Sequence, residues 1–218
     1  MNIKYFLHAI QIVKRRDYYF KDKDFEFSIN FTFQDIANEE ISNYVIEKIK
    51  ELNIGNRVVF EIVESEEIDD FNLINGFFST IRKLGCKIAI DDFGIGVSGL
   101  KLLYFSEANI IKIDRFFISN IDQDSKKKLF CSSIIDMAHI MGMQVIAEGV
   151  ETQKEFYTCK DIGADFIQGF LVQKPTKNIN EILPIYNDIS NLILDDKRED
   201  QNNEIITVKR LLVIRRKF

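Results

Sequence analysis

Short apolar runs alternate with helix-forming segments along most of the chain, and this alternation limits the fold more than any other feature. Each strand-like run is followed by apolar residues at helical spacing, as in successive βα units. Units of this kind build either an open doubly wound sheet or a closed barrel. Strands are expected at 25–30, 57–63, 86–91, 109–114, 143–148 and 165–171, and helices at 3–16, 41–52, 71–84, 98–105, 129–141, 152–162 and 178–194.

Polar residues at the strand ends separate these two folds. No Gly-x-Gly-x-x-Gly follows the first strand, so a dinucleotide-binding sheet has no support. In a barrel of parallel strands, the C-terminal strand ends ring one mouth, where the chemistry lies. The pattern therefore favours a TIM-like barrel, with one polar residue at or near the end of each of six successive strands: Asn30, Glu61, Asp91, Lys112, Glu148 and Gln168.

The strand at 86–91 ends in two adjacent carboxylates, Asp91 and Asp92, followed by Phe93 and Gly94. Neighbouring carboxylates repel each other and lose solvation when buried, so they persist where cations or protons relieve the cost. Oxygen ligands of this kind suit hard divalent ions such as Mg²⁺ or Mn²⁺. The alternative is an acidic turn in which the first Asp caps a helix.

Composition excludes several classes of protein. The formal net charge is −5, which argues against a broad DNA- or RNA-binding surface. No apolar stretch is long enough to span a membrane. Cys86, Cys131 and Cys159 show neither a disulfide framework nor zinc spacing, so a reducing cytoplasm is expected.

Several separate motifs, in order, resemble the EAL-domain family of cyclic-di-GMP phosphodiesterases over roughly residues 1–176. They are an asparagine-bearing strand (28–32), a Glu-x-x-Glu-Ser strand (60–65), an acidic pair (91–94), a lysine strand (111–115), a late glutamate motif (147–152) and a last strand (168–170). The resemblance implies an α/β fold, a TIM-like (β/α) barrel of the EAL type. The Glu-Ala-Leu strand that names the family is absent, so the barrel is expected to be incomplete at its N-terminus.

The composition of the chain changes after Leu194, which indicates a domain boundary. Residues 1–194 are expected to form the partial barrel, and 195–218 a charged linker and tail. For 205–218 the composition allows three alternatives, namely an edge strand, a short basic helix or a disordered tail, and it favours the tail.

By resemblance, the activity would be hydrolysis of cyclic-di-GMP to linear pGpG by a two-metal mechanism in bacterial second-messenger signalling. The cofactors would be two Mg²⁺ or Mn²⁺ ions. Asn30, Glu61 and Asp91 would hold one ion, and Asp91, Asp92 and Glu148 the other. No nucleic acid partner is implied; a homodimer or an upstream sensor or cyclase domain would be the protein partner.

The resemblance assigns roles to the remaining positions as well. Lys112 would orient the attacking water or the phosphate, and Glu148 would accept a proton as well as bind metal. Glu64 would anchor the loop after the acidic pair, and Gln168 would face the substrate. Taken singly, each residue has a structural alternative: a turn at Asn30, a solvated strand end at Glu61 or Glu64, an ion pair of Lys112 with Asp114 or Glu61, or a helix cap at Glu148.

The loop after the acidic pair departs from the family. Ile95, Val97 and Gly99 stand where the family more often has Thr, Tyr and Ser. This loop helps to organise the metals and the dimer in the family. The departure and the absent strand motivate an alternative function, a catalytically inactive EAL-like module that binds cyclic-di-GMP or a protein partner.

Overall fold

The computed structural model describes residues 26–63, 71–96, 99–172, 174 and 211–214. The chain divides into two compact units, Met1–Lys112 with Arg210–Phe218, and Ile113–Lys209. The expected helices at 3–16 and 178–194 lie outside the described residues.

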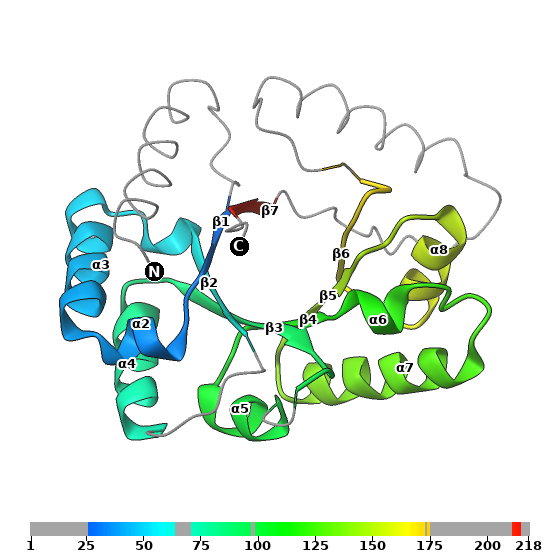
Figure 1. Cartoon of the computed structure of the whole chain (residues 1–218), viewed down its shortest axis with the longest axis horizontal. Coiled ribbons are helices and arrows are strands. Elements are labelled where there is room, and N and C mark those ends of the chain that lie inside the picture. The colour runs from blue at the N-terminus through cyan, green and yellow to red at the C-terminus, as the bar shows by residue number, and fades with distance from the viewer. Residues whose placement is uncertain (1–25, 64–70, 97–98, 173, 175–210, 215–218) are drawn as a thin grey trace. The chain divides into compact units, whose positions relative to one another are not determined.

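In the first unit, strands alternate with helices and pair in parallel (Figure 1). Strand β1 pairs with β2 and with β7, and β2 pairs with β3, all in parallel. The elements are β1 (Glu26–Asn30), α2 (Phe33–Ala37), α3 (Glu39–Leu52), the 3-10 helix η1 (Gly55–Arg57), β2 (Val58–Val63), α4 (Phe71–Lys83), β3 (Lys87–Phe93), α5 (Gly99–Ser106), β4 (Ile110–Ile113), whose last residue begins the second unit, and β7 (Leu211–Ile214).

In the second unit, β5 and β6 pair in parallel, with Glu148 in register with Gln168. Hydrogen bonding orders the strands of the first unit as β4-β3-β2-β1-β7 and pairs β5 with β6 in the second. The remaining elements are α6 (Arg115–Ile118), α7 (Ser125–Ile140), β5 (Gln144–Glu148), α8 (Gln153–Asp161) and β6 (Phe166–Gln168).

The six strands expected from the sequence are all present, and the α/β class is confirmed. Sequence periodicity missed two short helices, α2 and α6, because four or five residues are too few to show a helical period. Strand β3 also runs on through Asp92 to Phe93, past the expected end. Of the three alternatives for 205–218, the structure has an edge strand over Leu211–Ile214, paired with β1.

Alternation along β2 fixes the orientation of Glu61. Successive side chains of a strand point to opposite faces. Phe60 is fully buried against Phe31 and Phe77, with ring centroids 5.3 and 5.7 Å away. Since this aromatic cluster holds one face of β2 against α4, Glu61 is directed to the opposite face of the sheet.

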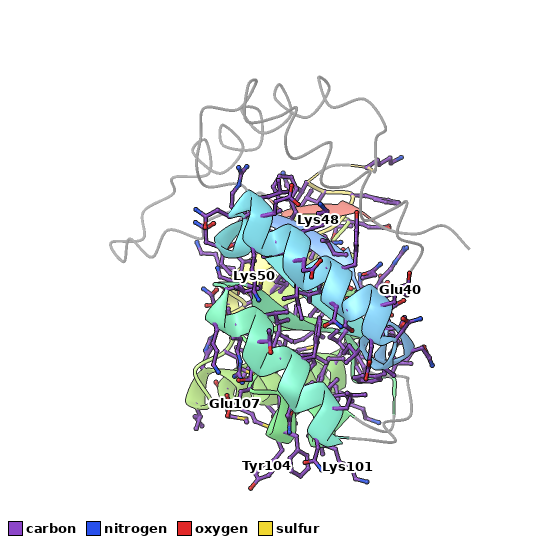
Figure 2. The ribbon with its side chains drawn as sticks, turned by 90° about the vertical axis from the view of Figure 1, so that its left-hand side faces the viewer. Glu40, Lys48, Lys50, Lys101, Tyr104 and Glu107 are labelled. Carbon is purple, nitrogen blue, oxygen red and sulfur yellow. The ribbon has the colours of Figure 1, made fainter. Side chains whose placement is uncertain are left out.

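Helix α3 covers the first unit and is well defined at both ends. The Asn38 side chain accepts a hydrogen bond from the Ile41 N–H at the start, and Asn53 ends the helix in the left-handed conformation. Val45 and Ile49 are buried, whereas Glu40 and Lys50 are exposed. Figure 2 shows α3 beside α4, with the charged side chains of α3 on its outer side.

All three cysteines, Cys86, Cys131 and Cys159, lie in the described part of the chain and are free and buried. Burial raises the pKa of each thiol to about 12. Among the described residues, no helix combines the length and apolar character needed to cross a membrane.

Candidate active site

Parallel register in the first unit aligns the polar strand ends. Asn30 is directly opposite Glu61 on β1 and β2, and Glu61 is opposite Ala89 on β3. Asp91 lies two residues beyond Ala89, so its side chain shares the face of Glu61 and Asn30. The expected convergence of these three residues on one face is therefore present in the first unit.

Lys112 on β4 lies between the two acids of this face. Its Nζ is 2.6 Å from Oδ1 of Asp91 and 3.0 Å from Oε1 of Glu61. Lys112 and Glu61 are 0% exposed and Asp91 is 4% exposed. Of the two structural partners considered for Lys112, Glu61 is found and Asp114 is not: the Asp114 carboxylate accepts from the Phe116 N–H and caps α6.

The charges on this face do not balance. Glu61 and Asp91 together carry two negative charges against the single positive charge of Lys112 when all three are ionised. Buried charge without a counter-charge is costly, so the arrangement favours a further cation.

Several oxygens on this face are also unsatisfied. Oδ1 of Asn30 and Oε2 of Glu61 are buried and accept no hydrogen bond within the described part of the chain, whereas Oε1 of Glu61 lies 3.0 Å from the Lys112 ammonium. Buried polar atoms normally have a partner, and an oxygen without one requires an explanation. Amide and carboxylate oxygens are the ligands that Mg²⁺ and Mn²⁺ prefer, so this donor set fits a divalent ion.

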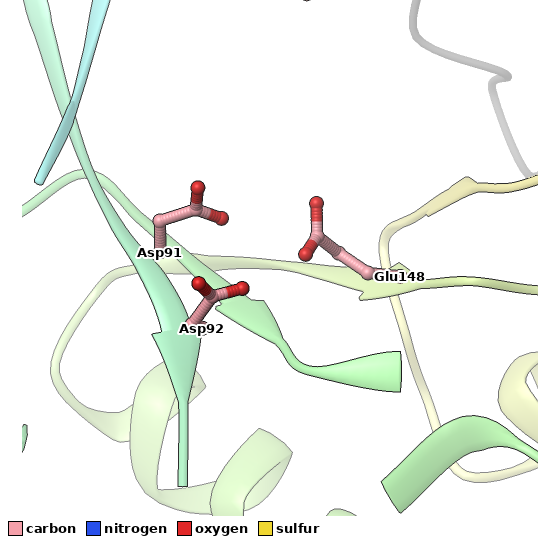
Figure 3. A group of neighbouring side chains, drawn as sticks. All are labelled: Asp91, Asp92 and Glu148. Atoms are coloured by element: carbon pink, nitrogen blue, oxygen red, sulfur yellow. The ribbon is translucent and has the colours of Figure 1, made fainter. Parts of the chain in front are cut away.

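The acidic pair ends β3 with unusual backbone geometry. Asp92 has φ +54°, in the left-handed region, and it is half-buried, whereas Asp91 is buried. The positive φ interrupts the alternation of the strand, and Figure 3 shows both carboxylates directed to the same side of β3. Left-handed residues other than Gly are uncommon, and Asn and Asp are the residues that adopt this conformation most readily.

In the second unit, Glu148 ends β5 and is 4% exposed. Its register partner on β6 is Gln168, whose Oε1 is buried and accepts no hydrogen bond from the described residues. Glu148 does not cap the next helix, because Thr152 is the N-cap of α8. Two residues predicted for the site thus share one face of the β5–β6 pair.

The segment after Glu148 is held by contacts that the motif analysis missed. Gly149 has φ +71°, and a Cβ there would lie 2.3 Å from Cγ of Arg115. Nη2 of Arg115 is 2.7 Å from Oε1 of Glu151. Glu155 is buried and accepts backbone hydrogen bonds from two loops. Part of this network is visible in the sequence as the Thr-x-x-Glu capping box at Thr152.

Glu64, the residue expected to anchor the loop after the acidic pair, lies outside the described residues.

The fold and these residues define a class: parallel α/β proteins with acidic, amide and lysine side chains at the strand ends. The EAL domain family matches residues 4–175, and the chain belongs to this family. One curated relative shows the extent of the similarity in sequence. Cyclic di-GMP phosphodiesterase PdeF of Escherichia coli is 35% identical over 132 residues, which are 59% of this chain and 18% of PdeF.

Two solved structures are similar to this chain in fold. An EAL domain protein of Listeria monocytogenes is 26% identical, with a TM-score of 0.73, covering 83% of this chain and 71% of that protein. The manganese and cyclic-di-GMP complex of Klebsiella pneumoniae BlrP1 is 28% identical, with a TM-score of 0.65, covering 70% of this chain and 40% of BlrP1. The fold is thus of the EAL barrel type. The chain spans about a fifth of the length of the curated relatives it matches.

Proposed function

We propose that this chain hydrolyses a phosphodiester bond of cyclic-di-GMP, giving linear pGpG, with Mg²⁺ or Mn²⁺ as cofactor. The buried group of Asn30, Glu61, Asp91 and Lys112 carries the proposal, because it holds oxygens without a hydrogen-bond donor and two carboxylates against a single ammonium. Membership of the EAL family and similarity to a manganese and cyclic-di-GMP complex support the same substrate and metals.

Two sets of ligands would hold the metal. Asn30, Glu61 and Asp91 offer oxygens on one face of the first unit. By resemblance to the EAL family, Asp91 and Asp92 of the first unit and Glu148 of the second would hold a second ion. When bound, divalent ions lower the pKa of a shared water and neutralise charge on the phosphodiester.

The chain's own side chains would then orient the reactants. Lys112, held between Asp91 and Glu61, presents a compact ammonium that hydrogen-bonds the attacking water or a phosphate oxygen. Glu148 accepts the proton of the water. Gln168, on the same face as Glu148, offers its unsatisfied amide oxygen to the substrate.

The test is turnover by the purified chain. Cyclic-di-GMP and Mn²⁺ are expected to yield the linear dinucleotide, and Glu61→Gln or Asp91→Asn to abolish the product. Glu26→Gln is the matched control, because Glu26 lies on β1 and pairs with Lys87 instead of Lys112. No product at high enzyme concentration, with the chain folded and Mn²⁺ in excess, rejects hydrolysis.

One observation favours a second function, nucleotide or protein binding without catalysis. Lys112 already neutralises part of the charge on Glu61 and Asp91, which lessens the need for a metal. An inactive module would bind cyclic-di-GMP in calorimetry with no turnover. Absence of nucleotide binding as well would leave a protein partner, such as a second copy or an attached sensor or cyclase domain.

A further inference from the structure

Two segments of the second unit follow residues of the proposed site directly. Residues 115–120 follow strand β4, which carries Lys112, and residues 149–152 follow Glu148 at the end of β5. Whatever fixes 149–152 also restricts the position of the Glu148 carboxylate, because only one peptide bond separates Glu148 from that segment. The contacts that join the two segments are therefore relevant to catalysis.

The strongest of these contacts comes from Glu155 on α8. This carboxylate is 5% exposed. Its Oε1 accepts from the backbone N–H of Asn120 at 2.8 Å, and its Oε2 accepts from the N–H groups of Glu151 and Thr152, each at 2.9 Å. One side chain thus joins a loop 35 residues away to the segment that follows Glu148.

A second contact joins the same two segments at the surface. Arg115 and Glu151 form an ion pair with side chains 57% and 37% exposed. The aliphatic part of Arg115 occupies the space that a Cβ of Gly149 would need. Exposed ion pairs contribute little because water screens them, so the buried Glu155 is the more important of the two contacts.

We propose that Glu155 is a positioning residue, which holds the segment after Glu148 against the loop at Asn120 and so fixes where the Glu148 carboxylate points. The proposal rests on the function proposed above for its catalytic consequence, although the structural part stands alone. Only a carboxylate serves here, because each of its two oxygens accepts from a different loop. The amide of a glutamine has one acceptor oxygen, and its NH₂ group would face an N–H donor.

Glu155→Gln in the full chain separates this role from simple capping. Amide hydrogen exchange at Asn120, Glu151 and Thr152 is expected to accelerate about tenfold or more, as for loss of a hydrogen bond to a charged group. Turnover of cyclic-di-GMP is expected to fall about 10- to 100-fold in kcat, as when a group that orients a metal ligand is removed. The KM is expected to stay close to the wild-type value, because the Glu155 carboxylate is buried and both of its oxygens accept from backbone N–H groups.

Two control variants make the outcome specific. Asp161→Asn removes a carboxylate from the exposed end of the same helix and is expected to change neither exchange nor kcat. Thr152→Ala removes the capping hydroxyl of α8 but leaves Glu155 able to reach Asn120. If Thr152→Ala lowers kcat as much as Glu155→Gln does, Glu155 acts only through the helix start and the proposal is overturned.

Hydrogen exchange tests the positioning role of Glu155, and turnover tests the proposed function, so each proposal can be rejected without the other. Unchanged exchange at Asn120 in Glu155→Gln overturns the positioning role, even in an active enzyme. A wild-type chain with neither turnover nor Mn²⁺ binding overturns the proposed function. Faster exchange in Glu155→Gln would then show that Glu155 holds the two segments together without a catalytic consequence.

Discussion

The ammonium of Lys112 lies 2.6 Å from the carboxylate of Asp91, and neither side chain is more than 6% exposed. The two residues come from neighbouring βα units, and Glu61 lies on the other side of the same ammonium. In a low-dielectric setting, the members of such a group depend on one another much more than those of an exposed pair. This dependence gives the first prediction.

Lys112→Met is expected to destabilise the chain by about 3–5 kcal/mol, because Glu61 and Asp91 remain buried without their cation. Lys48→Met is the control: the side chains of Lys48 and its partner Glu51 are 32% and 57% exposed, so loss of this pair should leave the free energy of unfolding nearly unchanged. Urea denaturation measures both. Added Mn²⁺ should restore part of the stability of Lys112→Met; equal losses for the two lysines would contradict the buried-charge argument.

Asp92 is expected to matter for metal binding more than for folding. Asn tolerates the left-handed φ of +54°, so Asp92→Asn should keep its melting temperature but bind Mn²⁺ more than about tenfold more weakly, which is about 1.4 kcal/mol. Asp92→Ala should lose the same affinity and also about 1–2 kcal/mol of stability. Calorimetric titration and thermal denaturation separate the two effects. Unchanged Mn²⁺ affinity in Asp92→Asn would remove this residue from the ligand set.

Parts of this site were predictable from the sequence because parallel strands bring their C-terminal ends together. That rule placed Asn30, Glu61 and Asp91 on one face without any structure. It did not place Lys112 beside Asp91, because that pairing depends on strand register. Asp114, the partner nearer in sequence, instead caps α6. Lys112 and Asp91 are 21 positions apart, and local sequence patterns do not predict how strands so far apart are aligned.

Glu155 illustrates the same limit. Its link to Thr152 is a local capping box, which spacing alone predicts. Its link to Asn120 joins residues 35 positions apart and follows from the packing of α8 beside the loop after α6. The left-handed φ of Asn120 and Asp92 likewise has no unambiguous sequence signal, although Asn and Asp are the residues that adopt it most readily after Gly.

Gly149 and Gly142 form a matched pair for the contact with Arg115. Both have positive φ, +71° and +76°, so alanine at either position should lose about 1–2 kcal/mol from backbone strain. A Cβ at Gly142 meets no atom within 4 Å, whereas at Gly149 it would overlap Arg115. Gly149→Ala should therefore lose about 1–3 kcal/mol more than Gly142→Ala in chemical denaturation, and it alone should lower turnover. Equal losses at both glycines would show that Arg115 moves aside freely.

The last prediction concerns how the stability contributed by the buried carboxylate of Glu155 depends on pH. Burial by itself would raise the pKa of Glu155, but hydrogen bonds from the N–H groups of Asn120, Glu151 and Thr152 outweigh it and hold the pKa below the usual 4.5. The stability that this carboxylate contributes is therefore fully present above about pH 4.5 and is lost as the pH falls through the lowered value.

In urea titrations, the advantage of the wild type over Glu155→Gln should stay constant from pH 7 to about pH 5 and shrink below about pH 4.5. Ser133→Ala, a neutral change on the exposed side of α7, corrects for the general effect of acid on the unfolding free energy. An advantage that grows on acidification would mean that the folded state prefers protonated Glu155, and burial would then outweigh the three backbone hydrogen bonds.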